Sequence, residues 1–205
     1  MRVKTDAKRR AILAAAGAVF RETGFSGASM AAVAERLGAS KATLYRYFAS
    51  KEDLFVSLMF DAVFDDANAN FDRLKPSDDL GRTLERFGAR YLASSLSDAS
   101  ISVRRNSISE GWRSGIGDML YDRGAKTLWS RMAQFMVGEI AAGRLRDVDP
   151  WMMSMHLRGM LEADVINRAV IGARYDARPK HLRVHASKAV DAFLRAYANT
   201  SAISR

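Results

Sequence analysis

The strongest constraint on the fold of this chain is the stretch from Ser29 to Phe48, which reads SMAAVAERLGASKATLYRYF. Two short helical patterns, residues 30–37 and 41–47, are separated by a break that contains Gly38. The second pattern carries small, hydroxyl, aromatic and basic side chains. Two short helices with such a turn are typical of a helix-turn-helix, whose second helix enters the major groove of DNA.

The sequence marks the ends of both helices. Ser29 and Ser40 can each accept a hydrogen bond from a free amide of the first helical turn, so both are predicted N-caps. Gly38 can take the left-handed conformation that ends the first helix. Helical spacing predicts which side chains face inward: Met30, Val33, Ala34, Leu37, Leu44 and Phe48.

The outward side chains of the second helix are unsuited to a hydrophobic core. Lys41, Thr43, Tyr45 and Arg46 supply an ammonium group, a hydroxyl, an aromatic ring and a guanidinium. Such groups bind DNA phosphates and the edges of bases. We therefore expect this face to contact DNA.

A third helix start follows at Ser50, with Asp53 three residues further on. A helix N-terminus offers free amides to an anion, and Lys51 adds a full positive charge there. We therefore expect a DNA phosphate to bind at this position.

Together these features closely resemble the DNA-binding domain of the TetR/AcrR family of bacterial transcriptional regulators. The resemblance covers roughly the first quarter of the chain, and its Leu-Tyr-x-x-Phe-x-x-Lys-x-x-Leu spacing is specific. It is carried by Thr23-Gly24-Phe25, Ser29-Met30, Val33-Ala34, Leu37-Gly38-Ala39-Ser40, Thr43-Leu44-Tyr45-Arg46-Tyr47-Phe48 and Ser50-Lys51-Glu52-Asp53-Leu54.

The resemblance implies DNA contacts at Ser29, Lys41, Ala42, Thr43, Tyr45, Arg46, Tyr47 and Lys51. Tyr45, Tyr47, Thr43 and Lys51 are expected to bind phosphates, although one of the two tyrosines is expected to serve packing in part. Lys41, Ala42 and Arg46 are expected to face base edges. Arg46 departs from the aromatic residue or histidine often found at this position in the family, and an arginine there can read guanine.

The resemblance also implies an all-α chain with two domains: a three-helix, helix-turn-helix DNA-binding domain at 1–50 and a helical effector-binding and dimerisation domain at 51–205. The segment from Arg105 to Pro150 looks like the C-terminal domain of AefR-like members of the family.

Apolar spacing and turn residues predict the remaining helices. A basic arm at residues 2–10 leads into a helix that ends at Thr23-Gly24, and residues 76–79 form a turn with a helix cap. The other predicted helices are 51–74 as one continuous helix, 80–92, 101–108, 112–121, 125–143, 151–171 and 179–197.

The last two predicted helices have wide apolar faces that need a partner surface. By resemblance to the family, helices near 150–171 and 179–198 pair with their copies in a homodimer that binds a palindromic, double-stranded operator. Internal packing alone is the alternative. In such a dimer the two DNA-reading heads would lie about 34–36 Å apart.

Aromatic and methionine residues of the C-terminal domain could line a pocket for a small, apolar effector. Taken singly, each of these residues is more often plain core. The candidates are Phe87, Tyr91, Trp112, Met119, Phe135, Met136, Trp151 and Met155.

Charge and composition agree with a DNA-binding protein inside the cell. The net charge is +9, and residues 1–56 hold ten Lys and Arg against five Asp and Glu, whereas the other 149 residues hold 22 against 18. A basic surface favours polyanions, although it also aids solubility. The chain has no cysteine, no apolar run of membrane-spanning length and no apolar signal core, so we expect a cytoplasmic protein without membrane contact.

Nothing in the sequence indicates catalysis or a cofactor. No nucleophile elbow and no Walker-type phosphate loop are present. His181 and His185 have the spacing of metal ligands on a helix, but no cysteine or carboxylate nearby in sequence completes a site, so no metal is expected. We expect a sequence-specific transcriptional regulator, a repressor released by an effector. The alternative is a ligand-binding or interaction module of the same fold without specific DNA recognition.

Overall fold

The computed structural model describes residues 5–61, 63–76 and 79–199. These residues are helical apart from turns and one isolated antiparallel bridge between Leu145 and Ala198. They form two compact units, which are described separately below. The first contains residues 5–61 and 106–120, and the second contains residues 63–76, 79–105 and 121–199. The all-α prediction is confirmed.

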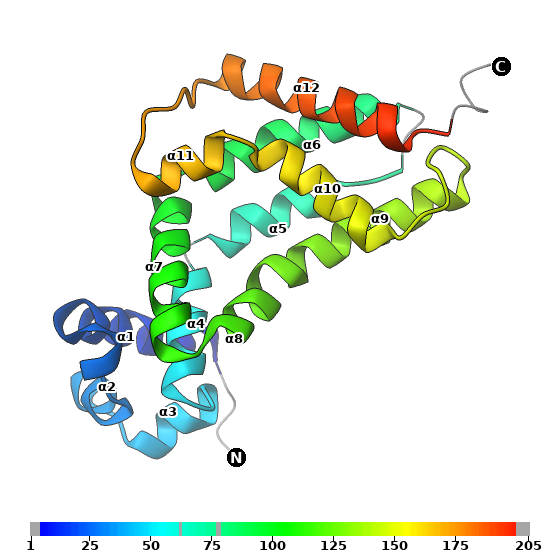
Figure 1. Ribbon diagram of the computed structural model, residues 1–205. Coiled ribbons are helices and arrows are strands. Elements are labelled where there is room, and N and C mark those ends of the chain that lie inside the picture. The colour runs from blue at the N-terminus through cyan, green and yellow to red at the C-terminus, as the bar shows by residue number, and fades with distance from the viewer. Residues whose placement is uncertain (1–4, 62, 77–78, 200–205) are drawn as a thin grey trace. The chain divides into compact units, whose positions relative to one another are not determined.

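The first unit is built on α1, which packs against α2 and α4 (Figure 1). Its core includes the rings of Phe20, Phe25 and Phe55, with Phe55 5.0 Å from Phe20 and 4.8 Å from Phe25 between ring centroids. The helices of this unit are α1 (Asp6–Gly27), α2 (Met30–Leu37), α3 (Lys41–Tyr47), α4 (Lys51–Asp61), the C-terminal part of α7 (Asp98–Ser114) and most of α8 (Gly117–Tyr121).

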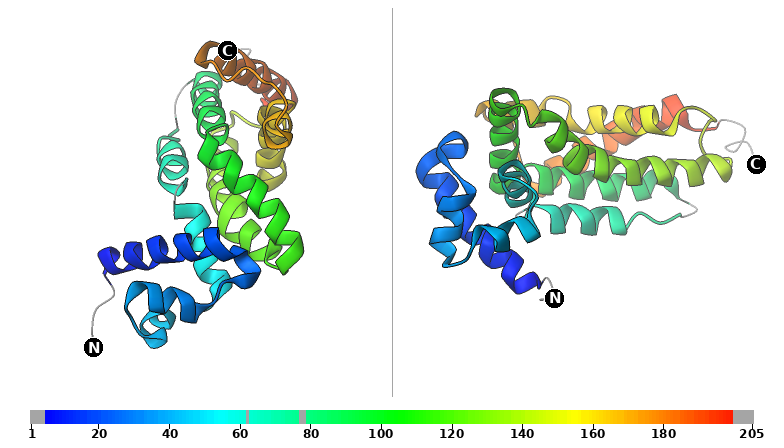
Figure 2. Two further views of the ribbon diagram at one scale, coloured as in Figure 1. Left: turned by 90° about the vertical axis from the view of Figure 1, so that its left-hand side faces the viewer. Right: turned by 90° about the horizontal axis from the view of Figure 1, so that it is seen from below.

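The second unit is a layered bundle of long helices. Figures 1 and 2 show α12 running beside α6 and α10 beside α9, and α10 and α12 are also in contact. Its helices are α5 (Phe64–Asp72), α6 (Leu80–Ser95), the N-terminal part of α7, a π-helical turn (Asp122–Lys126), α9 (Thr127–Ala141), α10 (Pro150–Glu162), α11 (Val165–Ile171) and α12 (Pro179–Tyr197).

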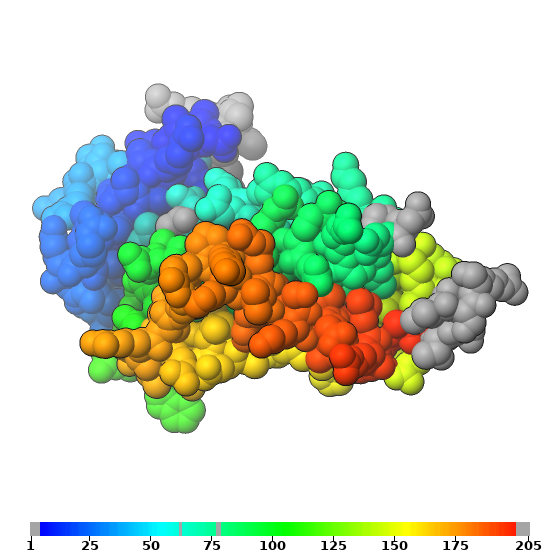
Figure 3. Space-filling view, turned by 90° about the horizontal axis from the view of Figure 1, so that it is seen from above, coloured from blue at the N-terminus to red at the C-terminus, as the bar shows by residue number. Residues whose placement is uncertain are grey.

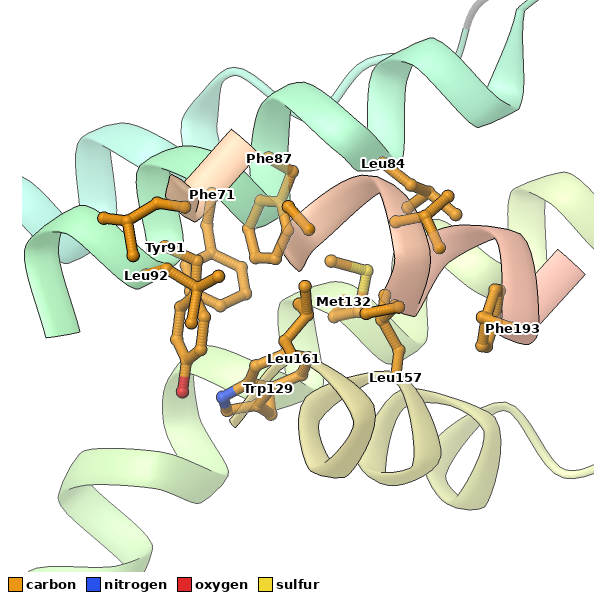
Figure 4. Close-up of a cluster of buried hydrophobic side chains, with 14 of the residues drawn as sticks. Phe71, Leu84, Phe87, Tyr91, Leu92, Trp129, Met132, Leu157, Leu161 and Phe193 are labelled. Carbon is orange, nitrogen blue, oxygen red and sulfur yellow. The ribbon is translucent and has the colours of Figure 1, made fainter. Parts of the chain in front are cut away.

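The core of the second unit lies between α5, α6, α9, α10 and α12. Figure 4 shows Phe71, Phe87, Tyr91 and Trp129 gathered at one end, with Leu84, Leu157 and Phe193 toward the other. All seven side chains are buried. Apolar burial of this kind is the main favourable contribution to folding.

The prediction of one continuous helix at 51–74 is wrong. α4 ends at Asp61, and α5 begins at Phe64 after Val63, whose φ of −127° and ψ of −12° are not helical. No glycine or proline forces this break. The two halves bury apolar residues in different cores, because Leu54 and Phe55 belong to the first unit and Phe71 to the second.

The predicted domain boundary between residues 50 and 51 falls at the first residue of α4. The structure groups α4 with the first unit, because α4 packs against α1 and contributes Phe55 to the same aromatic core.

Two further predicted elements differ from the structure. α7 continues through Gly111 to Ser114, so the expected break between 108 and 112 is absent and the helix ends at Gly115, which has a φ of 67°. The predicted helix 151–171 is divided after Glu162. Asp164 has a φ of 64° and a ψ of −49°, and the amide of Val165 donates to the carbonyl of Ala163 at 2.8 Å, which is the geometry of a γ-turn.

Other local predictions are confirmed. α1 leaves helical geometry at Gly24, where φ is 70° and ψ is 175°. Asp79 caps α6 by accepting from the amide of Arg82 at 2.8 Å. Of the predicted basic arm, Arg2 and Lys4 lie outside the described residues, as do Ser77 and Asp78 of the predicted turn.

Candidate functional site

The first helix of the helix-turn-helix has the predicted caps. Ser29 Oγ accepts from the amide of Ala32 at 3.1 Å. At the other end Gly38 has a φ of 63° and a ψ of 37°, its amide donates to the carbonyl of Glu35, and the amide of Ala39 donates to the carbonyl of Ala34. This pair of bonds is a Schellman motif, which turns the chain sharply toward α3.

The orientation of α3 is fixed by two buried side chains. Leu44 is fully buried and Phe48 is 2% exposed. Ser40 caps the helix, because its Oγ accepts from the amide of Thr43 at 3.2 Å. With one face in the core, the helix presents its predicted DNA-contacting side chains to solvent, and Lys41, Ala42, Tyr45 and Arg46 are all exposed.

Tyr47 has a structural role besides any contact with DNA. Its hydroxyl oxygen accepts from the backbone amide of Thr5 at 3.1 Å, and this bond lowers the pKa of the phenol. The Arg46 guanidinium lies 5.6 Å from the centroid of the Tyr47 ring. Tyr47 therefore ties α3 to the start of α1, and its hydroxyl proton can still be donated to a phosphate.

Lys51 is held at the start of α4. Its Nζ donates to the carbonyl of Phe25 at 2.9 Å and lies 4.4 Å from the centroid of that ring. Ser50 Oγ caps α4 by accepting from the amide of Asp53 at 3.1 Å. An ammonium group has three donors, so one bond to a carbonyl leaves Lys51 able to bind an anion.

An open hollow of about 510 Å³ lies where α2, α3 and α4 begin. It brings together four of the predicted contacts, Ser29, Lys41, Tyr45 and Lys51. The remaining four, Ala42, Thr43, Arg46 and Tyr47, do not line it. Two ammonium groups and three helix starts make this surface attractive to phosphate oxygens.

The predicted effector-pocket residues do not form one group. Phe87, Tyr91 and Met136 are buried in the core of the second unit, and Phe135, Trp151 and Met155 pack against that core while partly exposed. Trp112 and Met119 belong to the first unit, and Trp112 is 93% exposed on α7.

A polar cluster in the second unit escaped the sequence analysis. Glu162 Oε1 accepts from the Tyr91 hydroxyl, from Arg104 at 2.8 Å and from Arg158 at 3.2 Å. Burial raises the pKa of the Tyr91 phenol. Burial would also raise the pKa of Glu162, but the two guanidinium charges and the donated hydrogen bonds outweigh it and hold that pKa below its usual value.

Neither His181 nor His185 lies within a set of described side chains that could bind a metal. His181 pairs with Asp176, and His185 Nε2 lies 3.0 Å from the carbonyl oxygen of Leu161. Over the described part of the chain, no three His, Cys, Asp or Glu residues are grouped so that they could hold a metal ion. No helix among the described residues has the length and apolar character needed to span a membrane.

Two family models match the chain. Residues 12–58 match the model of bacterial regulatory proteins of the tetR family, and residues 82–199 match the C-terminal domain of AefR-like transcriptional repressors. This chain belongs to the TetR family. The family consists of DNA-binding transcriptional regulators and not of enzymes, and the predicted resemblance is confirmed over both domains.

Curated transcriptional regulators of the helix-turn-helix type match about a quarter of the chain. The transcriptional activator FasR of Mycolicibacterium smegmatis is 38% identical over 58 residues, which are 28% of this chain and 26% of FasR. The regulator RutR of Escherichia coli K12 is 43% identical over 54 residues, 26% of each chain. The chain thus matches these relatives over about a quarter of their length.

Solved structures extend the likeness to the whole TetR-family fold. A regulator from Mesorhizobium loti has a TM-score of 0.77 and 25% identity, with 96% of this chain and all of that chain covered. The flavonoid-responsive regulator FrrA has a TM-score of 0.77 and 26% identity with the same coverage. A regulator from Agrobacterium tumefaciens, at 23% identity and a TM-score of 0.69, shares the fold over 98% of this chain and 99% of its own.

Proposed function

We propose that this chain is a homodimeric repressor that binds a palindromic operator through α3 and is released by a small, apolar effector. The observation that carries the DNA-binding part is the face of α3, where Lys41, Ala42, Tyr45 and Arg46 are exposed while Leu44 is buried. A regulator that binds chromosomal DNA would function in the bacterial cytoplasm.

Arg46 gives the sharpest test of base reading. A bidentate contact between arginine and guanine is worth about 1–3 kcal/mol of discrimination. Arg46→Ala should weaken binding to DNA from the protein's own promoter by that amount and change binding to scrambled DNA of equal length much less. Fluorescence anisotropy at matched salt measures both. Arg21→Ala, an exposed arginine on α1, is the control for the loss of one positive charge.

Equal losses on both DNAs for Arg46→Ala would mean that Arg46 contacts only phosphate. Equal affinity of the wild-type protein for both DNAs would contradict sequence-specific binding altogether and favour an interaction module of the same fold.

The homodimer is supported by the outer face of α10. Figure 3 shows α12 on the surface of the second unit, flanked by α6 and α10. On α10, the exposed positions Met152, His156 and Gly159 recur at helical spacing. Small and apolar residues in such a row let two helices approach closely. We propose that the helices α10, α11 and α12, within 150–171 and 179–198, form the dimer interface.

The effector response is supported by the aromatic core of the second unit and by the flavonoid-responsive regulator FrrA, which has the same fold. Repression is supported by the AefR-like repressor model that matches residues 82–199. Transcription in vitro from the protein's own promoter should fall when the protein is added and recover when the flavonoid naringenin follows. An increase on adding the protein would indicate an activator.

A further inference from the structure

An unpaired hydrogen-bond acceptor lies in the core of the second unit. Asn70 on α5 is 4% exposed, and its Nδ2 donates to the carbonyl of Phe87 at 3.2 Å. That carbonyl can only accept, which fixes the orientation of the amide. Asn70 Oδ1 is then buried without a partner. An unsatisfied buried acceptor costs free energy and is an uncommon feature of a native core.

Four aromatic rings pack together in the same core, and Figure 4 shows them gathered in one group. Phe71, the residue after Asn70 in the chain, lies 5.0 Å from Phe87 between ring centroids. Phe87 is stacked with Tyr91 at 5.9 Å, and Trp129 meets Tyr91 edge-on at 5.2 Å. Such a cluster offers both the face and the edge of aromatic rings to a planar molecule.

The far side of the cluster carries more positive than negative charge. Arg104 and Arg158 share one carboxylate, and both of their bonds go to the same oxygen, Oε1 of Glu162. Their side chains are 27% and 22% exposed and that of Glu162 is 19% exposed. The Arg158 guanidinium lies 5.9 Å from the centroid of the Trp129 ring. A surplus charge in a half-buried position favours binding of an anion.

The two polar ends are connected through α6. Asn70 bonds to Phe87, and the hydroxyl of Tyr91 is next to Glu162. Phe87 and Tyr91 are four residues apart on α6, which is about 6 Å along the helix. The residues that carry the two ends are therefore about one helical turn apart on α6.

We propose that the second unit binds an aromatic compound with an acidic oxygen at one end and a hydroxyl at the other. The acidic oxygen, a carboxylate or a phenolate, accepts from Arg104 and Arg158 in competition with Glu162. The hydroxyl donates to Asn70 Oδ1. The ligand enters by parting the four rings, which are in mutual contact in this structure, and the free energy of parting them lowers its affinity. This inference rests on the proposed effector response, and it replaces the apolar effector by an aromatic molecule that carries an anionic oxygen.

Calorimetric titration of the full chain without DNA tests the site. The probe is 4-hydroxycinnamate, compared with its uncharged amide and with cinnamate, which lacks the hydroxyl. We expect the acid to bind about 10- to 100-fold more tightly than the amide, because hydrogen bonds to charged groups are the stronger ones. Cinnamate should bind more weakly than 4-hydroxycinnamate. This comparison uses the wild-type protein alone, so it does not depend on the folding of any variant.

Two variants assign the ends of the ligand. Arg104→Met should weaken the acid by a similar factor and leave the amide nearly unchanged, whereas Asn70→Leu should remove the advantage of the hydroxylated acid over cinnamate. Arg82→Met is the matched control, because Arg82 lies on α6 with its side chain 75% exposed. Naringenin separates the two sources of an acidic oxygen. Its binding should strengthen as the pH rises toward the pKa of its phenols, whereas cinnamate, which has a carboxylate and no phenol, should bind equally across that range.

The inference is overturned if neither 4-hydroxycinnamate nor naringenin binds saturably, or if acid and amide bind alike and neither variant changes the pattern. Its fate is separable from that of the proposed function. If the ligands bind as predicted but do not release promoter DNA, the site stands and effector release fails. If another compound releases the DNA while these ligands do not bind, effector release stands and the site fails.

Discussion

At the scale of single residues, Glu162 makes the stability of the fold depend on pH. Its folded-state pKa lies below the ordinary value of 4.5 because of Arg104 and Arg158. A carboxylate with a lowered pKa stabilises the fold above its unfolded-state pKa, and this contribution is lost as the pH falls through the folded-state pKa. The loss therefore occurs below about pH 5.

We predict that the free energy of unfolding of the wild-type protein falls more between pH 6 and pH 3 than that of Glu162→Gln. Urea unfolding at each pH measures the difference. Glu85→Gln is the control, because Glu85 accepts from the neutral hydroxyl of Ser187 and not from a guanidinium. Parallel curves for wild type and Glu162→Gln would show that Glu162 is not stabilised by its two arginines in solution.

At the scale of helices, local signals were predictable and tertiary ones were not. The caps Ser29, Gly38 and Ser40 act within a few residues of their own positions, so the sequence alone placed them correctly. The break after Asp61 depends on which core each half of the segment joins. A single sequence carries no such information. The same holds at Asp164, where the chain takes a positive φ without a glycine.

The candidate sites divide in the same way. The exposed face of α3 follows from helical spacing around Leu44. In the polar cluster, Glu162 lies 71 positions from Tyr91 and 58 positions from Arg104 in the sequence. No local sequence pattern could therefore predict this cluster. Trp129 could have been found, since it shares helical spacing with Met132 and Met136 on α9.

Replacing Gly38 or Gly138 with alanine should change the free energy of unfolding in opposite directions. Gly38→Ala should lower the free energy of unfolding by about 1–2 kcal/mol, because an alanine is strained in the left-handed conformation. Gly138→Ala should raise it by about 0.5–1 kcal/mol, because Gly138 lies inside α9 with no atom within 4 Å of an added Cβ. Thermal unfolding of both variants checks the signs. A stabilised Gly38→Ala protein would contradict the Schellman motif.

At the scale of the whole molecule, the proposed binding to a palindromic operator requires two copies of the chain. Gly159 lies in the exposed row of α10, and no atom lies within 4 Å of a Cβ added there. Gly159→Glu should therefore leave the protomer folded while placing a charge in the proposed interface. We predict that its mass by light scattering falls from twice 22.7 kDa to 22.7 kDa.

Gly138→Glu is the matched control for this experiment. Gly138 is also an exposed helical glycine with open space around it, but it lies on α9, outside the proposed interface. This variant should remain a dimer. A dimeric Gly159→Glu protein with unchanged helicity would move the interface away from α10.

The central claim is that this TetR-family chain reads a DNA sequence, and the ratio of two dissociation constants tests it most directly. We would measure the affinity of the wild-type protein for DNA from its own promoter and for a scrambled duplex at one physiological salt concentration. Specific binding is typically about 10³- to 10⁷-fold tighter than non-specific binding, so we predict a ratio of at least about 10³. A ratio near one, with both affinities falling steeply as salt rises, would show that the basic surface binds phosphates alone and would contradict the account.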